Sequence, residues 1–200
     1  MKYYCLTLKE VPERTEHAKR EAAKAGIELD FIYGFFGKTL EVVPRIPMHT
    51  DYYIGRGITC IYLSWLMAWQ IALREGHDEF VMFEDDLFLP EDFVPRLEKI
   101  LSEKPSGCEM IFLGSCCTED KFKQKITNDL YDVRYPMCLH AMWFKRSAVE
   151  KFLAQQHPAN TPIDIVMEQK WLSQVNVLTV LPELVGQGSN GRGIASAAHM

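Results

Sequence analysis

Several features that mark other classes of protein are missing from this sequence. Lysine and arginine number 22 against 27 aspartates and glutamates, so the net charge is −5 and no basic stripe of the kind that binds nucleic acid is present. No run approaches the roughly 18 apolar residues that a membrane span needs. The N-terminus enters a strand pattern directly and lacks the layout of a signal peptide. We therefore expect a cytoplasmic protein that has no transmembrane segment and does not bind nucleic acid.

The cysteines show no spacing typical of a metal or redox site. The sequence has six, and none of them forms a Cys-x-x-Cys pair. Several lie within apolar runs, where cysteine behaves as a small hydrophobic residue. We expect all of them to be reduced, structural thiols: Cys5, Cys60, Cys108, Cys116, Cys117 and Cys138.

What is present is a chain of ordinary domain size in which strand and helix patterns alternate. The 200 residues suit a single domain, 1–200. Alternation of this kind predicts an α/β fold with a mostly parallel sheet flanked by helices. Expected strands cover 3–8, 29–33, 80–84, 109–114, 137–144 and 175–181, and expected helices cover 13–25, 58–74, 90–101, 147–155 and 163–172. Segments 41–57 and 115–134 and the tail 186–200 are expected to be irregular, and a serine cap at Ser147 is expected to begin its helix.

The most informative segment is an apolar strand pattern that stops at three carboxylates. Residues 80–83 are Phe-Val-Met-Phe, and Glu84, Asp85 and Asp86 follow them directly. A buried strand cannot keep three adjacent anions in its core, so we expect them at the surface where the strand emerges. In open α/β sheets this carboxyl edge is where ligands bind. The triplet could hold a divalent cation, grip hydroxyl groups or merely solvate a turn.

Other motifs follow in order along nearly the whole chain. They are Arg14 after the first strand, Gly37-Lys38-Thr39-Leu40, the segment Gly57 to Ser64, Phe83-Glu84-Asp85-Asp86, Ile111 to Gly114, His140-Ala141, Pro162-Ile163-Asp164 and Pro182 to Gln187. Taken together, these motifs resemble those of glycosyltransferase family 25, which includes bacterial lipopolysaccharide galactosyltransferases and collagen galactosyltransferases.

The resemblance implies a GT-A type, nucleotide-sugar-binding fold and a hexosyltransferase activity. The implied reaction moves a sugar, galactose or glucose, from a UDP-sugar donor to a hydroxyl acceptor on a glycan, lipid-linked sugar or protein, with inversion. Carboxylates suit Mn²⁺ or Mg²⁺, which would neutralise the leaving diphosphate. Asp86 is the first expected metal ligand because it lies furthest from the strand. Glu84 is the second, since side chains two apart in extended backbone share one side.

The resemblance also indicates donor-binding residues and a general base. The expected donor-binding set comprises Glu84, Asp85, Arg14, Gly37, His140, Gln187 and Ser189. Asp164, which matches a Pro-x-Asp motif of the family, is the expected base that takes the proton of the acceptor hydroxyl. The alternative for Asp164 is a helix N-cap, and the alternative for His140 is a packed core residue.

One position departs from the family pattern. Ser64 is followed by Trp65, where a histidine is usual, so a non-catalytic nucleotide-sugar-binding module of the same fold stays open as an alternative. Trp65 and Trp69 lie four residues apart on one helix face, which favours core packing for both. A nucleotidyltransferase is a weaker alternative, because Gly34, Gly37 and Lys38 make a poor phosphate-binding loop.

Overall fold

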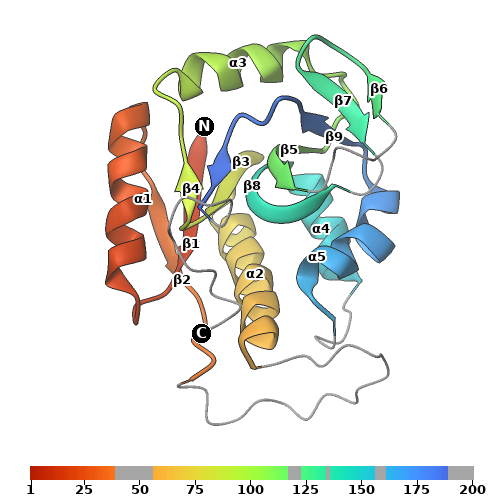
Figure 1. Cartoon of the computed structure of the whole chain (residues 1–200). Coiled ribbons are helices and arrows are strands. Elements are labelled where there is room, and N and C mark those ends of the chain that lie inside the picture. The colour runs from red at the N-terminus through yellow and green to blue at the C-terminus, as the bar shows by residue number, and fades with distance from the viewer. Residues whose placement is uncertain (39–55, 117–122, 134–135, 156–160, 189–200) are drawn as a thin grey trace.

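A mixed sheet, mostly parallel, forms the centre of the molecule (Figure 1). The computed structural model describes residues 1–38, 56–116, 123–133, 136–155 and 161–188, and within these the sheet has eight strands. In spatial order they are β2 (Asp30–Tyr33), β1 (Lys2–Thr7), β3 (Glu79–Glu84), β8 (Met137–Lys145), β5 (Met110–Cys116), β9 (Val177–Val180), β7 (Leu130–Val133) and β6 (Lys123–Lys125). β8 runs antiparallel to both its neighbours, whereas β2, β1 and β3 are parallel to one another, as are β5 and β9. The expected α/β fold is confirmed.

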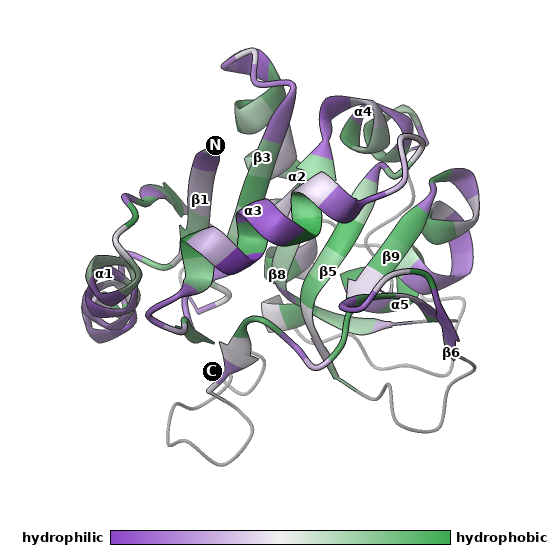
Figure 2. Cartoon of the chain, turned by 90° about the horizontal axis from the view of Figure 1, so that it is seen from above, coloured by the Kyte–Doolittle hydropathy of each residue, from purple (hydrophilic) through white to green (hydrophobic). Residues whose placement is uncertain are grey.

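Helices cover both faces of this sheet. α1 (Pro12–Ala25) and α3 (Phe93–Glu103) pack on one face, and Figure 2 looks down on α3 with the apolar strands beneath it. α2 (Arg56–Arg74), α4 (Arg146–Ala154) and α5 (Ile163–Val166) pack on the other face. α5 continues as a π-helical turn (Met167–Trp171) and a 3₁₀ turn (Leu172–Gln174). Among the described residues, no helix combines the length and the hydropathy needed to cross a membrane.

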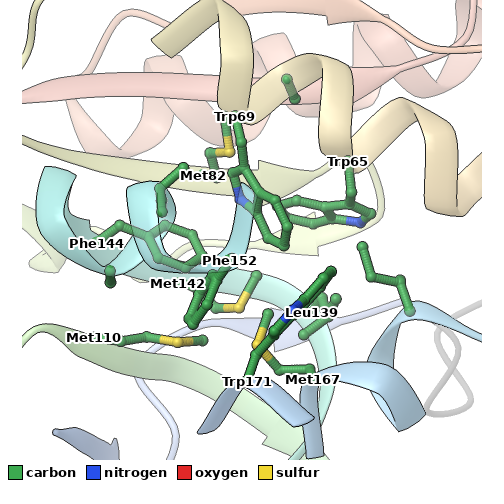
Figure 3. Close-up of a cluster of buried hydrophobic side chains, with 14 of the residues drawn as sticks. Trp65, Trp69, Met82, Met110, Leu139, Met142, Phe144, Phe152, Met167 and Trp171 are labelled. Atoms are coloured by element: carbon green, nitrogen blue, oxygen red, sulfur yellow. The ribbon is translucent and has the colours of Figure 1, made fainter. Parts of the chain in front are cut away.

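The alternation of side chains along β3 divides the core into two clusters. Phe80 and Met82 face the α2 side, and Val81 and Phe83 face the α1 and α3 side. On the α2 side, aromatic rings of several elements meet around Trp69, whose centroid lies 5.8 Å from that of Trp65 (Figure 3). Both tryptophans are fully buried, so their predicted packing role is confirmed.

The ends of α1 follow from its sequence. Pro12 occupies its first turn, where the missing N–H costs nothing. Gly26 ends the helix at φ 69°, a left-handed conformation that glycine adopts without strain.

The start of α4 differs from the prediction: Lys145 is the N-cap residue, and the hydroxyl of Ser147 donates instead to Glu109 Oε1 at 2.7 Å. A partner distant in the sequence thus displaces the local cap.

Two segments expected to be irregular contain strands. Ser115 and Cys116 extend β5, and residues 123–125 and 130–133 form the antiparallel pair β6–β7, which joins the sheet through β9. Gly186–Gln187 form β10, which pairs with β4 (Leu87–Phe88). β7 and β10 pair with segments distant in the sequence, β9 and β4, and local sequence does not reveal these contacts. Residues 39–55 and 189–200, including most of the expected 41–57 loop, lie outside the described residues.

One pair of cysteines is bonded, so the expectation of six reduced thiols is wrong. Cys116 at the end of β5 forms a disulfide with Cys138 near the start of β8, with Cα atoms 5.8 Å apart. The antiparallel register sets Cys116 opposite Met137, the neighbour of Cys138, and this pairing brings the two sulfurs together. Cys5, Cys60 and Cys108 are free and buried, as expected, and Cys117 lies outside the described residues.

A methyl group at Gly114 should destabilise the fold. A Cβ atom built there meets the His140 ring and the Val185 carbonyl oxygen, and the latter is backbone that cannot rotate away. We expect Gly114→Ala to lower the free energy of unfolding by about 1–3 kcal/mol, measured by urea denaturation. The control is Gly107→Ala, whose Cβ finds its nearest neighbour, Asn176 Nδ2, at an ordinary 3.6 Å. Equal urea midpoints for the two variants would contradict the close packing described.

Candidate functional site

A cavity opens at the carboxyl ends of three neighbouring strands. Its walls come from the ends of β1, β2 and β3, from the first half of α2, and from two single side chains, Arg14 of α1 and Gln187 of β10. This is the edge at which open α/β sheets bind ligands. A cavity therefore lies at the carboxyl edge of the sheet, where we expected the site.

The cavity combines an apolar part with an acidic part. Leu6, Phe35, Phe36 and Ile61 contribute apolar surface, and the three carboxylates after β3 also line the wall. Concave sites with an apolar lining and a few polar groups are typical of small-molecule binding. Gly37, expected to contact the donor, lies in this lining.

The hydroxyl of Ser64 holds the segment after β2 against α2. Ser64 Oγ donates to the Cys60 carbonyl at 2.6 Å and accepts from the Phe35 N–H at 2.8 Å. A Cβ at Gly34 would lie 2.6 Å from that oxygen, so only glycine allows this approach. Ser64 and Gly34 were not among the expected donor-binding residues, although both occur in segments with recognisable motifs.

Asp85 and Asp86 are buried and Glu84 is partly buried, whereas the sequence led us to expect all three carboxylates at the surface. β3 ends at Glu84, and Asp85 and Asp86 form the turn that follows. These two aspartates are only 4% and 3% exposed. Arg14 Nη2 lies 2.7 Å from Asp85 Oδ1 and 3.6 Å from Asp86 Oδ2, and this charge makes the burial possible. We expected the side chains of Glu84 and Asp86 to share one side of an extended strand, and this is wrong because β3 ends at Glu84. Both residues nevertheless line the cavity.

A threonine that the sequence analysis missed completes the partners of Asp85. The hydroxyl of Thr7 donates to Asp85 Oδ2 at 2.7 Å and lies 3.0 Å from the Thr15 hydroxyl. The pairing of β1 with β3 sets Leu6 beside Glu84 and so brings Thr7 close to Asp85. No signal within either segment indicates this contact, which depends on strand order.

The carboxyl groups of Asp85 and Glu84 differ in the neighbours that shift their pKa. Burial raises the pKa of Asp85, while the Arg14 charge and the Thr7 hydrogen bond act to lower it. Burial, followed by the charge of Asp86, raises the pKa of Glu84 to about 8, although the Trp65 N–H favours the ionised form. Glu84 therefore binds its proton more tightly than an exposed glutamate does when no ligand is bound.

The C-terminal strand β10 completes the site. Gln187 Nε2 donates to Asp86 Oδ2 at 3.3 Å, and the N–H of Gly188 donates to the Asp86 carbonyl at 2.8 Å. The structure thus brings the predicted residue Gln187 to the acidic turn. Ser189, the other predicted residue of this tail, lies outside the described residues.

His140 is packed beneath the site and does not line the described cavity. It is completely buried on β8, and its Nε2 lies 3.1 Å from the Val185 carbonyl, to which a protonated Nε2 donates. Burial lowers the pKa of His140, so the ring is neutral at neutral pH. The packed alternative fits this position, and the donor-binding role of His140 stays a prediction.

Asp164 also lies away from the described lining of the cavity. It is on the first turn of α5, where Pro162 is the N-cap residue, so the predicted N-cap role is wrong. Asp164 Oδ1 accepts a hydrogen bond from the Ile165 N–H at 2.9 Å, and burial raises the pKa of this carboxyl.

The sheet order and the acidic turn at its carboxyl edge define a GT-A-like α/β protein. The model of the family described as "Glycosyltransferase family 25 (LPS biosynthesis protein)" matches residues 1–167. The chain therefore belongs to glycosyltransferase family 25 and is a glycosyltransferase. No curated protein matches the sequence.

Two solved structures are similar in fold. One is a glycosyltransferase involved in the glycosylation of the major capsid of PBCV-1, with 9% identity, a TM-score of 0.50, and coverage of 100% of this chain and 97% of that one. The other is A197 from STIV, with 12% identity, a TM-score of 0.50, and coverage of 92% and 83%. At such identities the likeness concerns the fold alone.

The buried His140 should make stability depend on pH. Its folded-state pKa lies below the ordinary 6.5, so below pH 6.5 the unfolded chain binds a proton that the folded protein still excludes. Stability is full above about pH 6.5 and falls as the pH drops toward the folded-state value, by up to about 1.4 kcal/mol for each pH unit. We expect His140→Gln to reduce the loss of unfolding free energy between about pH 7.5 and pH 5.5, measured by urea denaturation. A half-exposed histidine, His77, provides the control as His77→Gln, and an equal loss in the His140 variant and the wild type would refute the assignment.

Proposed function

We propose that this glycosyltransferase moves a hexose, galactose or glucose, from a UDP-sugar to a hydroxyl of a glycan, lipid-linked sugar or protein, with inversion and with a divalent cation. The observation that supports it best is the acidic segment of Glu84 and the buried residues Asp85 and Asp86, which lines a cavity that also has an apolar part. An apolar wall suits a nucleobase, and the acidic turn suits a cation that bridges to the diphosphate. The donor and the inversion rest on the family resemblance.

The side chains of the turn fit such a cation. Asp86 Oδ1 is buried and has no hydrogen-bond partner among the described residues, which leaves one oxygen available as a ligand. Glu84 lines the same cavity, where its carboxylate would either complete the ligand set or accept from a hydroxyl of the donor. No group of three or more acidic, histidine or cysteine side chains suited to a metal occurs in the described ranges. Mg²⁺ and related cations are commonly held by one or two carboxylates, with diphosphate oxygens and water as the other ligands.

When bound, the cation would neutralise charge on the departing diphosphate. The residues of the chain hold this arrangement in place. Arg14 and Thr7 fix the Asp85 carboxylate, and Gln187 fixes one oxygen of Asp86. The cost of ordering these groups is met during folding, so it does not weaken donor binding.

Asp164 remains our proposed general base. Burial raises the pKa of its carboxyl, a direction that makes a carboxylate a stronger base. To act on the acceptor, Asp164 must approach the donor in the complex, since it does not line the described cavity of the free protein.

The first test is thermal and chemical unfolding with a panel of UDP-sugars, each with and without Mn²⁺. A donor at 100 times its dissociation constant should raise the free energy of unfolding by about 2.7 kcal/mol. Stabilisation by one UDP-sugar that requires the metal supports the proposal. Absence of stabilisation by every donor contradicts it and favours a non-catalytic module of the same fold in which the nucleotide-sugar site is vestigial.

Asp86→Asn should abolish the metal-dependent part of this stabilisation. The change keeps the shape of the side chain but removes the charge that would bind the cation. The control is Asp92→Asn, at a side chain that is 65% exposed next to α3. A donor effect that still needs Mn²⁺ in Asp86→Asn would show that the metal assignment is wrong.

Asp164→Asn should keep donor affinity and reduce transfer. Loss of a general base typically lowers turnover by about 10²–10⁴-fold. Donor affinity is measured by the unfolding assay, and turnover by release of UDP in the presence of acceptor. Unchanged turnover would leave Asp164 with a local structural role at the start of α5.

A further inference from the structure

Among the described residues, the carboxyl group of Glu84 has one hydrogen bond, and its partner is Trp65. Its indole Nε1 donates to Glu84 Oε1 at 3.2 Å. Trp65 itself is fully buried, so its ring has a fixed position from which to donate. Glu84 lines the cavity, whereas Trp65 does not appear in the described lining. Trp65 therefore contacts Glu84 from the core and not from the cavity.

The position of Trp65 is set by the aromatic core. Its ring packs on Trp69, which in turn contacts Phe144 and Phe152 with centroid distances of 6.0 and 5.6 Å. Figure 3 shows Trp65 at the edge of this cluster, with its ring nitrogen on the side away from Trp69. A rigid donor of this kind loses little conformational freedom when it forms a hydrogen bond.

Glu84 needs such a donor, because its other neighbours are acidic. The charges of Asp86 and Asp85 act unfavourably on an ionised Glu84, and Arg14 offsets them only in part. Arg14 is already in contact with the two aspartates, at 2.7 and 3.6 Å. Without the indole, the described residues offer the Glu84 carboxyl group no hydrogen bond to fix its rotamer.

We infer that Trp65 is a positioning residue for donor binding: its indole N–H holds one oxygen of Glu84 so that the other faces the cavity and accepts from a hydroxyl group of the donor. This inference rests on the proposed function and adds a named contact to it. A carboxyl group that is held in one orientation favours ligands that have a hydroxyl group at the matching position. The indole bond works whether or not Glu84 carries a proton, because the oxygen accepts in both states.

The chain provides a matched control for this role. Trp69 is also fully buried on α2, but its indole N–H has no hydrogen-bond partner among the described residues. Trp65→Phe and Trp69→Phe therefore remove the same atoms from the same core, and only the first removes a hydrogen bond to the site. Trp65→His returns a ring N–H at that position and serves as the rescue variant.

The test measures KM for the donor, kcat and the unfolding temperature of all three variants and the wild type. A hydrogen bond to a carboxyl group corresponds to about tenfold in affinity, so we expect Trp65→Phe to raise the donor KM by roughly tenfold with little change in kcat. Trp69→Phe should lower the unfolding temperature and leave the donor KM within about twofold. Trp65→His should recover part of the lost affinity.

Equal effects of the two phenylalanine variants on KM, or an unchanged KM in Trp65→Phe, would overturn the inference while leaving the proposed function intact. Failure of the wild type to bind any UDP-sugar would instead overturn the proposed function, and the donor role of Trp65 with it. The hydrogen bond is tested separately in ¹⁵N-labelled protein, where Glu84→Gln should shift the indole N–H resonance of Trp65 and not that of Trp69. An unmoved Trp65 resonance would remove the basis of the inference.

Discussion

Arg14 places its guanidinium 2.7 Å from Asp85 and 3.6 Å from Asp86, and all three residues are buried. Three carboxylates in succession cannot enter a protein interior without a partner, because each isolated charge loses its hydration. Removing one partner of a buried pair typically costs about 3–5 kcal/mol. Asp85 and Asp86 can therefore lie beneath the surface only when α1 is docked against the turn that follows β3.

α1 carries two further contacts that extend this constraint along the chain. His17 Nε2 lies 2.7 Å from the Leu87 carbonyl, and the Glu21 carboxylate accepts from the Leu89 N–H at 2.8 Å. Both residues lie close to the helix face of Arg14, so one helix holds the turn and the strand β4 after it. β4 then pairs with β10, which delivers Gln187 to Asp86. The site depends in this way on segments from both ends of the described chain.

Most of the fold could be predicted because its signals are local. The apolar run before Glu84 marks a buried strand, and Gly26 marks the end of α1. The predictions failed where a distant partner decides the local structure. β7 is a strand because it pairs with β9, and Cys116 meets Cys138 because β5 pairs with β8. Neither pairing has a short-range sequence signal, since strand order is a property of the whole sheet.

The α/β class, the family motifs and the place of the carboxylates at the end of β3 could all be predicted, because periodicity and motif order are local properties of the chain. Which side chains meet those carboxylates depends on the packed fold. Thr7, Arg14 and Trp65 reach them from three different elements. The fold also places His140 in a packed position, with its Nε2 against the Val185 carbonyl. The physical reason is that a buried charge or polar group takes its partner from whatever the fold brings within hydrogen-bond distance, and that proximity arises only once the sheet and its helices have packed.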